Sequence, residues 1–254
     1  MDKVQMKIVT FNLLCDNEEG FAPRLAIAKR RFDAEKPDII GFQEARPIQQ
    51  RMLTEALPEY QIIGFGREKD FGGESNCVAV RKDTFTLFGF HQCWLSPTPF
   101  VPGTRFEEQS TCPRVVVTTL LKHKDRELPF RFYNTHLDHI GEQARVLGMG
   151  QIIARMKADN ADWELPMLLT GDMNDTPASP AIRCALEADP YPLEDLSAAA
   201  DYTFHGNGTV KAPYKIDYIF GSAGTEHSPA YIWDDCVDGK TISDHYPVAC
   251  DVIL

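Results

Sequence analysis

The feature that most constrains the fold of this chain is a succession of short apolar runs rich in β-branched and aromatic residues. Runs of this length and composition are typical of β-strands, and the sequence predicts about eleven of them. They lie at Met6–Phe11, Ile39–Phe42, Tyr60–Gly64, Asn76–Arg81, Phe85–Trp94, Arg114–Leu121, Phe130–Thr135, Met167–Thr170, Lys215–Phe220, Ala230–Trp233 and Tyr246–Ile253.

Helical patterns are fewer, and they lie at Pro23–Glu35, Pro47–Leu57, Glu142–Ala158 and Ser179–Ala188. The last of these opens with Ser-Pro, which places an N-cap before a proline in the first turn. A parallel barrel needs nearly one helix for each strand, so this ratio disfavours it. Two packed sheets with helices on their outer faces fit better. Because no linker, repeat or low-complexity segment divides the chain, we expect residues 1–254 to form a single α/β domain.

The overall charge is strongly acidic, with a formal net charge of -11 and a pI of about 5.1. Nucleic-acid binding usually requires a basic surface, because phosphate contacts supply most of the affinity. An acidic protein can still bind a small phosphorylated molecule where a bound cation inverts the local field. The charge therefore favours a small substrate over a polynucleotide.

The cysteines and the hydropathy pattern bear on the cellular compartment. The chain has 7 cysteines, widely spaced and without a CxxC pair, so neither a disulfide framework nor a zinc knuckle is indicated. The amino-terminal segment lacks the apolar core of a signal peptide, and no apolar run reaches the ~20 residues that span a bilayer. We expect a cytoplasmic protein without a membrane span, and the sequence does not indicate its oligomeric state.

Residues that bind cations or move protons stand at the ends of several predicted strands. They are Asn12, Glu44, His136, Asp172, Asn174, Asp244 and His245. Each alone has an ordinary explanation as a turn residue, a solvated carboxylate or a structural histidine. Asp217 differs, because it lies inside an otherwise apolar strand, where a carboxylate is unfavourable without a histidine or metal partner.

Together these residues indicate one site, because strand ends converge on the same edge of a layered sheet. Carboxylate and amide oxygens are hard ligands that suit Mg²⁺ or Mn²⁺. No cysteine clusters with the histidines, so zinc–thiolate binding is not indicated. The sequence also lacks a GxSxG elbow and a P-loop, and the GxGR of Gly64–Arg67 is too short for a dinucleotide fingerprint.

Six segments in this order resemble the endonuclease/exonuclease/phosphatase superfamily, which includes deoxyribonuclease I. They are TFN (10–12), QE (43–44), NTHLDH (134–139), GDMND (171–175), IDYIF (216–220) and SDHYPV (243–248). With WLSPTP (94–99), they resemble a bacterial branch of the superfamily whose members mostly lack an assigned substrate. The resemblance implies a four-layer αββα sandwich with its site at one edge of the two sheets.

The resemblance also implies a role for each matching residue. Glu44 corresponds to the metal-binding glutamate, and Asn12 and Asp244 complete or support the metal site. Asp172 would orient and deprotonate the attacking water, while Asn174 would hold the phosphate. His245, hydrogen-bonded to Asp217, would lie on the phosphate side, and His136 takes the place of a histidine in deoxyribonuclease I.

Weaker candidates surround this set. Arg114 begins a strand and is a candidate phosphate ligand, although arginines there are most often solvated. His139 and Asp138 are candidate pocket residues or parts of a plain turn, and Glu74 is a candidate rim residue. Trp94 and Phe100 are candidates for stacking on a ring, and for Trp94 core packing is the stronger expectation.

Three functions remain open at this point. The favoured one is metal-dependent hydrolysis of a phosphate ester or phosphodiester in a small molecule. The second is a nuclease that acts on DNA or RNA. The third is a binding protein that kept the fold without catalysis.

Overall fold

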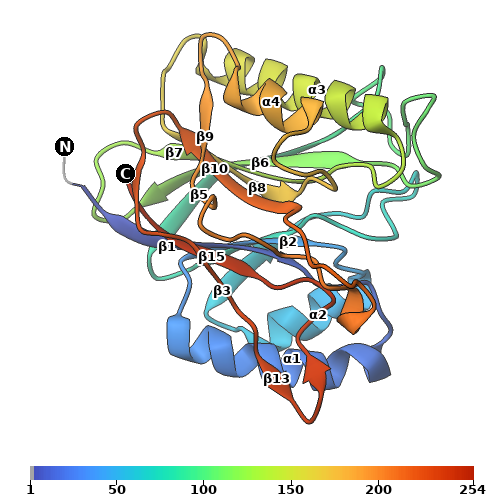
Figure 1. Cartoon of the computed structure of the whole chain (residues 1–254). Coiled ribbons are helices and arrows are strands. Elements are labelled where there is room, and N and C mark those ends of the chain that lie inside the picture. Colours follow the sequence, from blue (N-terminus) through green and yellow to red (C-terminus); the bar gives the residue numbers. More distant parts are fainter. Residues whose placement is uncertain (1–2) are drawn as a thin grey trace.

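The strands of the computed structural model, which describes residues 3–254, form two main sheets (Figure 1). The first sheet has the order β11-β15-β1-β2-β4-β3, and β12 also pairs with β15. Its strands are β1 (Gln5–Asn12), β2 (Ile39–Gln43), β3 (Tyr60–Ile63), β4 (Val78–Arg81), β11 (Glu226–His227), β12 (Tyr231–Ile232) and β15 (Val248–Ile253).

The second sheet has the order β5-β6-β7-β8-β10-β9. Its strands are β5 (Phe85–Trp94), β6 (Val115–His123), β7 (Phe130–His136), β8 (Met167–Asp172), β9 (Leu193–Asp195) and β10 (Asp217–Ser222). A separate hairpin consists of β13 (Cys236–Val237) and β14 (Lys240–Thr241).

The helices cover the outer faces of the two sheets, as Figure 1 shows. Helices α1 (Glu18–Glu35) and α2 (Pro47–Ala56) lie against the first sheet, and α3 (Glu142–Asn160) and α4 (Pro180–Leu186) against the second. A short 3-10 helix, η1 (Gly206–Gly208), lies between β9 and β10. The order helix–sheet–sheet–helix confirms the four-layer αββα sandwich that the sequence predicted.

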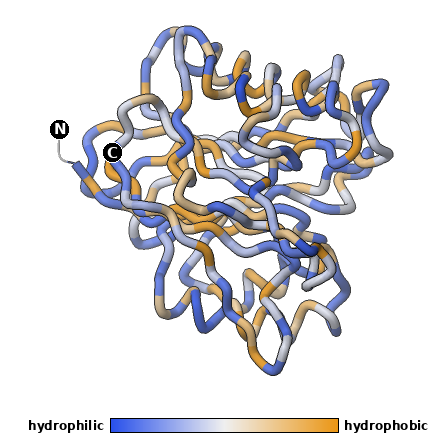
Figure 2. The backbone as a smooth tube through the Cα atoms, viewed as in Figure 1, coloured by the Kyte–Doolittle hydropathy of each residue, from blue (hydrophilic) through white to orange (hydrophobic). Residues whose placement is uncertain are grey.

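Three hydrophobic clusters hold these layers together. One lies between the two sheets, and the other two lie between each sheet and its helices. Figure 2 shows hydrophobic segments concentrated in the strands at the centre of the molecule. Because the central strands are buried on both faces, they read as continuous apolar runs rather than as alternating patterns.

Two kinds of element differ from the prediction. Helix α1 begins at Glu18 and not at Pro23, because the side chain of Asn17 caps it by accepting a hydrogen bond from the backbone N–H of Gly20 at 2.9 Å. Proline tolerance in a first turn was therefore the wrong signal for its start. The strands β9, β11, β13 and β14 were not predicted, because runs of two or three residues carry no recognisable periodicity, whereas β12 lies within the predicted strand Ala230–Trp233.

Candidate active site

The register of three adjacent strands aligns three of the predicted catalytic residues in one row. His136 at the end of β7 pairs with Asp172 at the end of β8. Asp172 pairs in turn with Asp217, the first residue of β10. The row therefore follows from backbone pairing alone, with Asp172 at its centre.

His245 completes this group from the segment that precedes β15 in the other sheet. Its Nδ1 lies 2.9 Å from Oδ2 of Asp217, and its Nε2 lies 3.7 Å from Oδ2 of Asp172. All three side chains are buried. The imidazole therefore bridges two carboxylates at the point where the two sheets meet.

Burial and charge act on this group in opposite directions. Burial alone would lower the pKa of His245, but the adjacent carboxylate of Asp217, with Asp172 behind it, raises that pKa to about 10. Burial, followed by repulsion from Asp217, raises the pKa of Asp172 to about 7. The geometry thus places a cationic imidazolium beside a carboxyl group that can exchange a proton near neutral pH.

Hydrogen bonds fix the orientation of the Asp172 carboxylate. Its Oδ2 accepts from Nδ2 of Asn12 at 2.9 Å, and its Oδ1 accepts from the backbone N–H of Asn174 at 2.8 Å. Asn174 has a φ of 49°, a left-handed conformation that asparagine tolerates. The Nδ2 atom of its side chain lies 2.9 Å from Nε2 of His136. Asn174 therefore links the central carboxylate to the histidine of the next strand.

Glu44 lies directly after β2 and is oriented by two donors. Asn12 Nδ2 lies 3.1 Å from Oε1 of Glu44, and the backbone N–H of Cys15 donates to Oε2 at 2.9 Å. Burial alone would raise the pKa of Glu44, but these hydrogen bonds lower it below its usual value. Glu44 is therefore held as a carboxylate, the form in which it can bind a cation.

Glu44, Glu74 and His136 form a group suited to a divalent cation. One ligand atom from each lies within 4.8 Å of the others. His136 Nδ1 is buried and has no hydrogen-bond partner among the described residues. Glu74 is held by Arg67, whose Nη2 lies 2.8 Å from its Oε2. Two carboxylates and an imidazole fit a divalent cation, and the oxygen-rich set favours Mg²⁺ or Mn²⁺.

Sequence reasoning assigned Glu74 only to the rim, and assigned Asp244 to the metal. Glu74 lies in a loop that is separated from β2 along the chain. The only indication of its role in the sequence was a carboxylate in a glycine-rich turn. In residues 3–254 two groups of side chains could hold a metal ion, Glu44–Glu74–His136 and Asp172–Asp217–His245, and Asp244 belongs to neither. Its Oδ1 accepts from Ser243 Oγ at 3.2 Å, so its metal role stays a prediction.

Arg114, the candidate phosphate ligand, is almost fully buried beside the centre, with 3% exposure, whereas arginines at strand starts are most often solvated. Its Nη2 lies 2.9 Å from Nδ1 of the exposed His139, and its Nε lies 3.7 Å from Asp138. Within residues 3–254, the Arg114 atoms Nε and Nη1 have no hydrogen-bond partner. Burial lowers the pKa of this guanidinium, and the charges of Asp138 and Asp172 oppose that effect.

Asp138 and the two aromatic candidates have local roles. The Oδ1 of Asp138 accepts from the backbone N–H groups of Ser110, Ile140 and Gly141, which fixes the turn before α3. Trp94 is buried, as expected, and its indole N–H donates to the Arg67 carbonyl at 2.6 Å. Phe100 is exposed at the end of its loop and contacts His91 edge to face.

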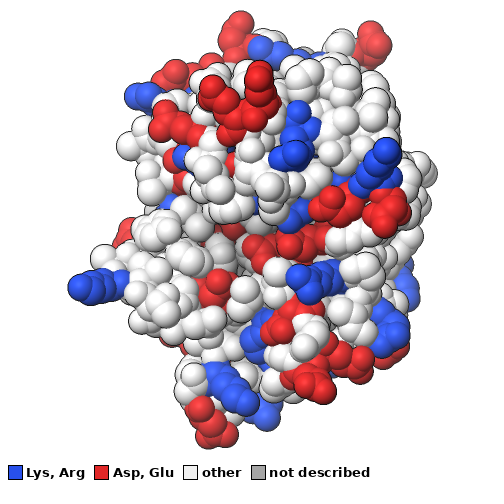
Figure 3. All heavy atoms as spheres, turned by 90° about the vertical axis from the view of Figure 1, so that its right-hand side faces the viewer, with Lys and Arg blue, Asp and Glu red and all other residues white. Residues whose placement is uncertain are grey.

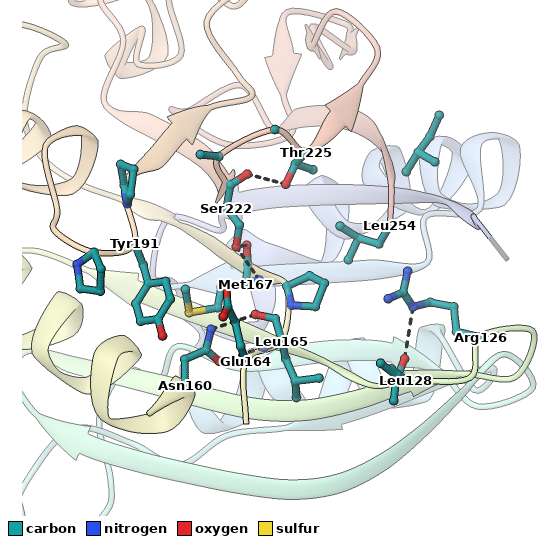
Figure 4. Close-up of a pocket in the computed structure, with 16 residues that line it drawn as sticks. Arg126, Leu128, Asn160, Glu164, Leu165, Met167, Tyr191, Ser222, Thr225 and Leu254 are labelled. Atoms are coloured by element: carbon teal, nitrogen blue, oxygen red, sulfur yellow. Dashed lines mark hydrogen bonds between the residues drawn. The ribbon is translucent and has the colours of Figure 1, made fainter. Parts of the chain in front are cut away.

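The surface has two further features, an acidic face (Figure 3) and a pocket away from the site. Figure 3 shows acidic side chains gathered across the middle of the face that lies at the right of Figure 1. A pocket of about 660 Å³ with Met167, Tyr191, Ser222 and Leu254 in its lining appears in Figure 4. Met167 begins β8, whereas Asp172 ends it, so this pocket lies at the other end of the strand and contains none of the predicted site residues.

The layered sandwich and its carboxylate–histidine centre define a class of αββα proteins with a site between two sheets. More closely, the model of the endonuclease/exonuclease/phosphatase family matches residues 9–245, and this chain belongs to that family. Members of the family are hydrolases that act on phosphoester bonds, and they generally use divalent metals.

Solved structures show how similar the chain is to its relatives. An endonuclease/exonuclease/phosphatase from Bacteroides vulgatus has 29% identity and a TM-score of 0.90, with 98% of each chain covered. A mannosyl-6-phosphatase from Bacteroides thetaiotaomicron has 26% identity and a TM-score of 0.85, with 98% of this chain and 100% of that chain covered.

A third structure, D. rerio TDP2 complexed with a single-strand DNA product, has 17% identity, a TM-score of 0.76 and 98% coverage of both chains. At this identity the likeness shows the fold alone. No curated protein matches the chain. Among residues 3–254, no helix combines the length and apolarity that a membrane crossing requires.

Proposed function

We propose that this protein is a divalent-metal-dependent phosphoesterase with a small phosphorylated substrate. The observation that carries the proposal is Asp172 held between His136 and Asp217, with the imidazole of His245 between the two aspartates. In such an arrangement one group accepts a proton while a fixed cation neutralises a phosphate oxygen.

The roles follow from the contacts of each side chain. Asp172, oriented by Asn12 and Asn174, accepts the proton of the attacking water. His245 opposes the charge that develops on a phosphate oxygen, and Asp217 fixes its ring and its charge. The Arg114 guanidinium, whose Nε and Nη1 have no partner among the described residues, supplies further donors to the phosphate. The Asn174 amide would donate to the phosphate after releasing the Leu137 carbonyl.

Glu44 is the main metal ligand in this proposal, with Asn12, Glu74, His136 and Asp244 completing or supporting the site. A bound divalent cation neutralises a phosphate oxygen and the charge that develops during hydrolysis. Mg²⁺ or Mn²⁺ suits the oxygen ligands. The Glu44 carboxylate is already oriented by Cys15 and Asn12, so binding requires little rearrangement.

Two observations support a small substrate over a polynucleotide. The net charge of -11 and the acidic face of Figure 3 disfavour the long-range attraction on which polynucleotide binding depends. The relative described as a mannosyl-6-phosphatase is more similar in sequence than the one complexed with DNA. Residues 1–254 would act as one domain, and the 7 free cysteines are consistent with a cytoplasmic location.

The proposal is tested by measuring phosphate release from a panel of sugar phosphates, nucleotides, phosphodiesters, lipid head groups and oligonucleotides, with Mg²⁺ or Mn²⁺. We expect activity on a small ester, and Asp172→Ala and Glu44→Ala should each lower it by roughly 10²–10³. Wild-type activity that survives excess chelator would contradict the metal role. If no ester is hydrolysed, the protein is a binding protein on this fold. Cleavage of the oligonucleotides, together with binding that weakens steeply with salt, would identify a nuclease.

A further inference from the structure

A second cavity lies beside the candidate active site and has no role in the chemistry described above. It has a volume of about 670 Å³, within the range of small-molecule sites. Its lining comes from the segment after β1, the first turns of α1, the η1 loop and the β13–β14 hairpin. The polar and aromatic lining residues used below are Asp16, Glu19, Arg24, His205 and Tyr246.

The backbone that forms this cavity also positions the catalytic centre. The N–H of Leu14, a lining residue, donates to Asn12 Oδ1 at 2.9 Å. The N–H of the lining residue His205 donates to the carbonyl of Asp244 at 3.0 Å. Tyr246 follows His245 directly. The cavity and the centre therefore share part of their walls.

His205 is the feature of this cavity that most indicates a ligand. Its side chain has only 5% exposure and stacks on Tyr246, with ring centroids 4.2 Å apart and an interplanar angle of 29°. Its Nε2 is buried without a hydrogen-bond partner among the described residues. A buried polar atom without a partner is unfavourable. A ligand hydroxyl would satisfy Nε2 in either tautomer, because a hydroxyl both donates and accepts.

The lining carries two carboxylates, Asp16 and Glu19, and two cations, Arg24 and the exposed Lys240, so it has no excess of positive charge for a second anionic group. Asp16 and Glu19 present carboxylates, which only accept hydrogen bonds. Arg24 is the nearest buried cation, but its donors are already used. They bind the carbonyls of residues 13, 14 and 242 and the carboxylate of Asp16. A neutral ligand rich in hydroxyl groups would match these acceptors, and the ring of Tyr246 offers it an apolar face.

We propose that this cavity binds the polyhydroxylated part of the substrate, a sugar or a cyclic polyol, while the phosphate lies at Asp172 and His245. The position of the phosphate rests on the proposed function. Binding of the polyol itself does not, because the cavity and its acceptors exist independently of hydrolysis.

The test is saturation-transfer NMR of the whole protein with unphosphorylated hexoses and inositol, which requires no catalysis. We expect the wild type to bind at least one of them. His205→Phe keeps an aromatic ring on Tyr246 but removes the nitrogen, and should weaken binding roughly 3- to 10-fold. Glu19→Ala, at an exposed position, should weaken binding without affecting folding. Tyr191→Phe, in the separate pocket of Figure 4, is the matched control and should leave binding as in the wild type.

Kinetics then separate this inference from the proposed function. His205→Phe should raise the KM for a polyol phosphate, relative to the KM for a simple alkyl phosphate. The expected factor is the roughly 3- to 10-fold loss of polyol binding. Loss of polyol binding in Glu19→Ala alone would support the cavity even if His205→Phe failed to fold. No binding to the wild type, or equal binding in the wild type and both cavity variants, would overturn the inference. Polyol binding without any phosphate release would support the inference about the cavity and contradict the proposed function.

Discussion

At the scale of single residues, this protein depends on a few polar side chains whose charges are set by their neighbours. Nε2 of His245 lies 3.7 Å from Oδ2 of Asp172, and both side chains are buried. The pKa of Asp172 is raised to about 7, and the pKa of His245 is raised to about 10. Asp217 contributes to both shifts, because it repels one group and attracts the other.

Asp217 therefore offers a sharp test of the site. Asp217→Asn removes the charge beside His245 while keeping a side chain of the same shape, so the imidazole loses its ion pair. We expect hydrolysis to fall by roughly 10²–10³, measured as kcat/KM. Asp175→Asn is the matched control, because Asp175 pairs with Arg145 at 2.9 Å outside the row. Equal losses in the two variants would show that the effect is not specific to the His245 pair.

At the scale of elements, an ion pair helps to fix how helix α1 lies on its sheet. Glu35, the last residue of α1, is bound by Lys7 of β1 and accepts from the hydroxyl of Tyr231 in β12 at 2.8 Å. Arg31 lies 3.3 Å from the same carboxylate. The hydrogen bond from Lys7, opposed by burial, lowers the pKa of Glu35 below its usual value.

This pKa shift predicts a pH-dependent stability. A carboxylate whose folded pKa is depressed stabilises the fold above its unfolded pKa, and that contribution is lost as the pH falls through the folded value. Glu35→Gln should therefore lower the free energy of unfolding by about 1–3 kcal/mol at pH 7. The difference from the wild type should vanish in acid, as measured by urea titrations at both pH values. Glu55→Gln, in an exposed pair 3.9 Å long, should have little effect at either pH.

At the scale of the whole molecule, the two sheets are joined by a buried polar network near the site. Gln43 donates through Nε2 to Asn134 Oδ1 at 2.8 Å, and Thr170 donates to the same oxygen at 3.1 Å. Gly41 makes this close packing possible. A Cβ at its position would lie 2.2 Å from Thr170 Oγ1 and 2.7 Å from Asn134 Oδ1.

Gly41→Ala should force the sheets apart at this point and reduce the free energy of unfolding by about 1–3 kcal/mol, as overpacking does. Gly150→Ala is the control with the opposite expected sign. Gly150 lies in α3 with nothing within 4 Å of an added Cβ, and alanine favours a helix there by about 1 kcal/mol. Equal effects of the two changes on chemical denaturation would contradict the role of Gly41 between the sheets.

The sequence predicted the layers well, because buried strands and the long helix α3 are specified by local patterns of apolar residues. Local patterns also identified Asn12, Glu44, Asp172 and His245 as candidates, since polar residues at the ends of buried strands are uncommon. These patterns misplaced the start of α1 and missed the short strands β9, β11, β13 and β14, where capping and pairing outweigh periodicity.

What the sequence determined by itself is therefore the set of layers, the family and the chemical character of the site. Only the tertiary structure decided which groups meet. The alignment of His136, Asp172 and Asp217 is a matter of strand register, and the approach of His245 depends on the packing of two sheets. The cavity beside His205 likewise needs three separate stretches of the chain, residues 14–24, 205–208 and 239–246. Distances between such segments arise from packing and pairing, which no single stretch of sequence encodes.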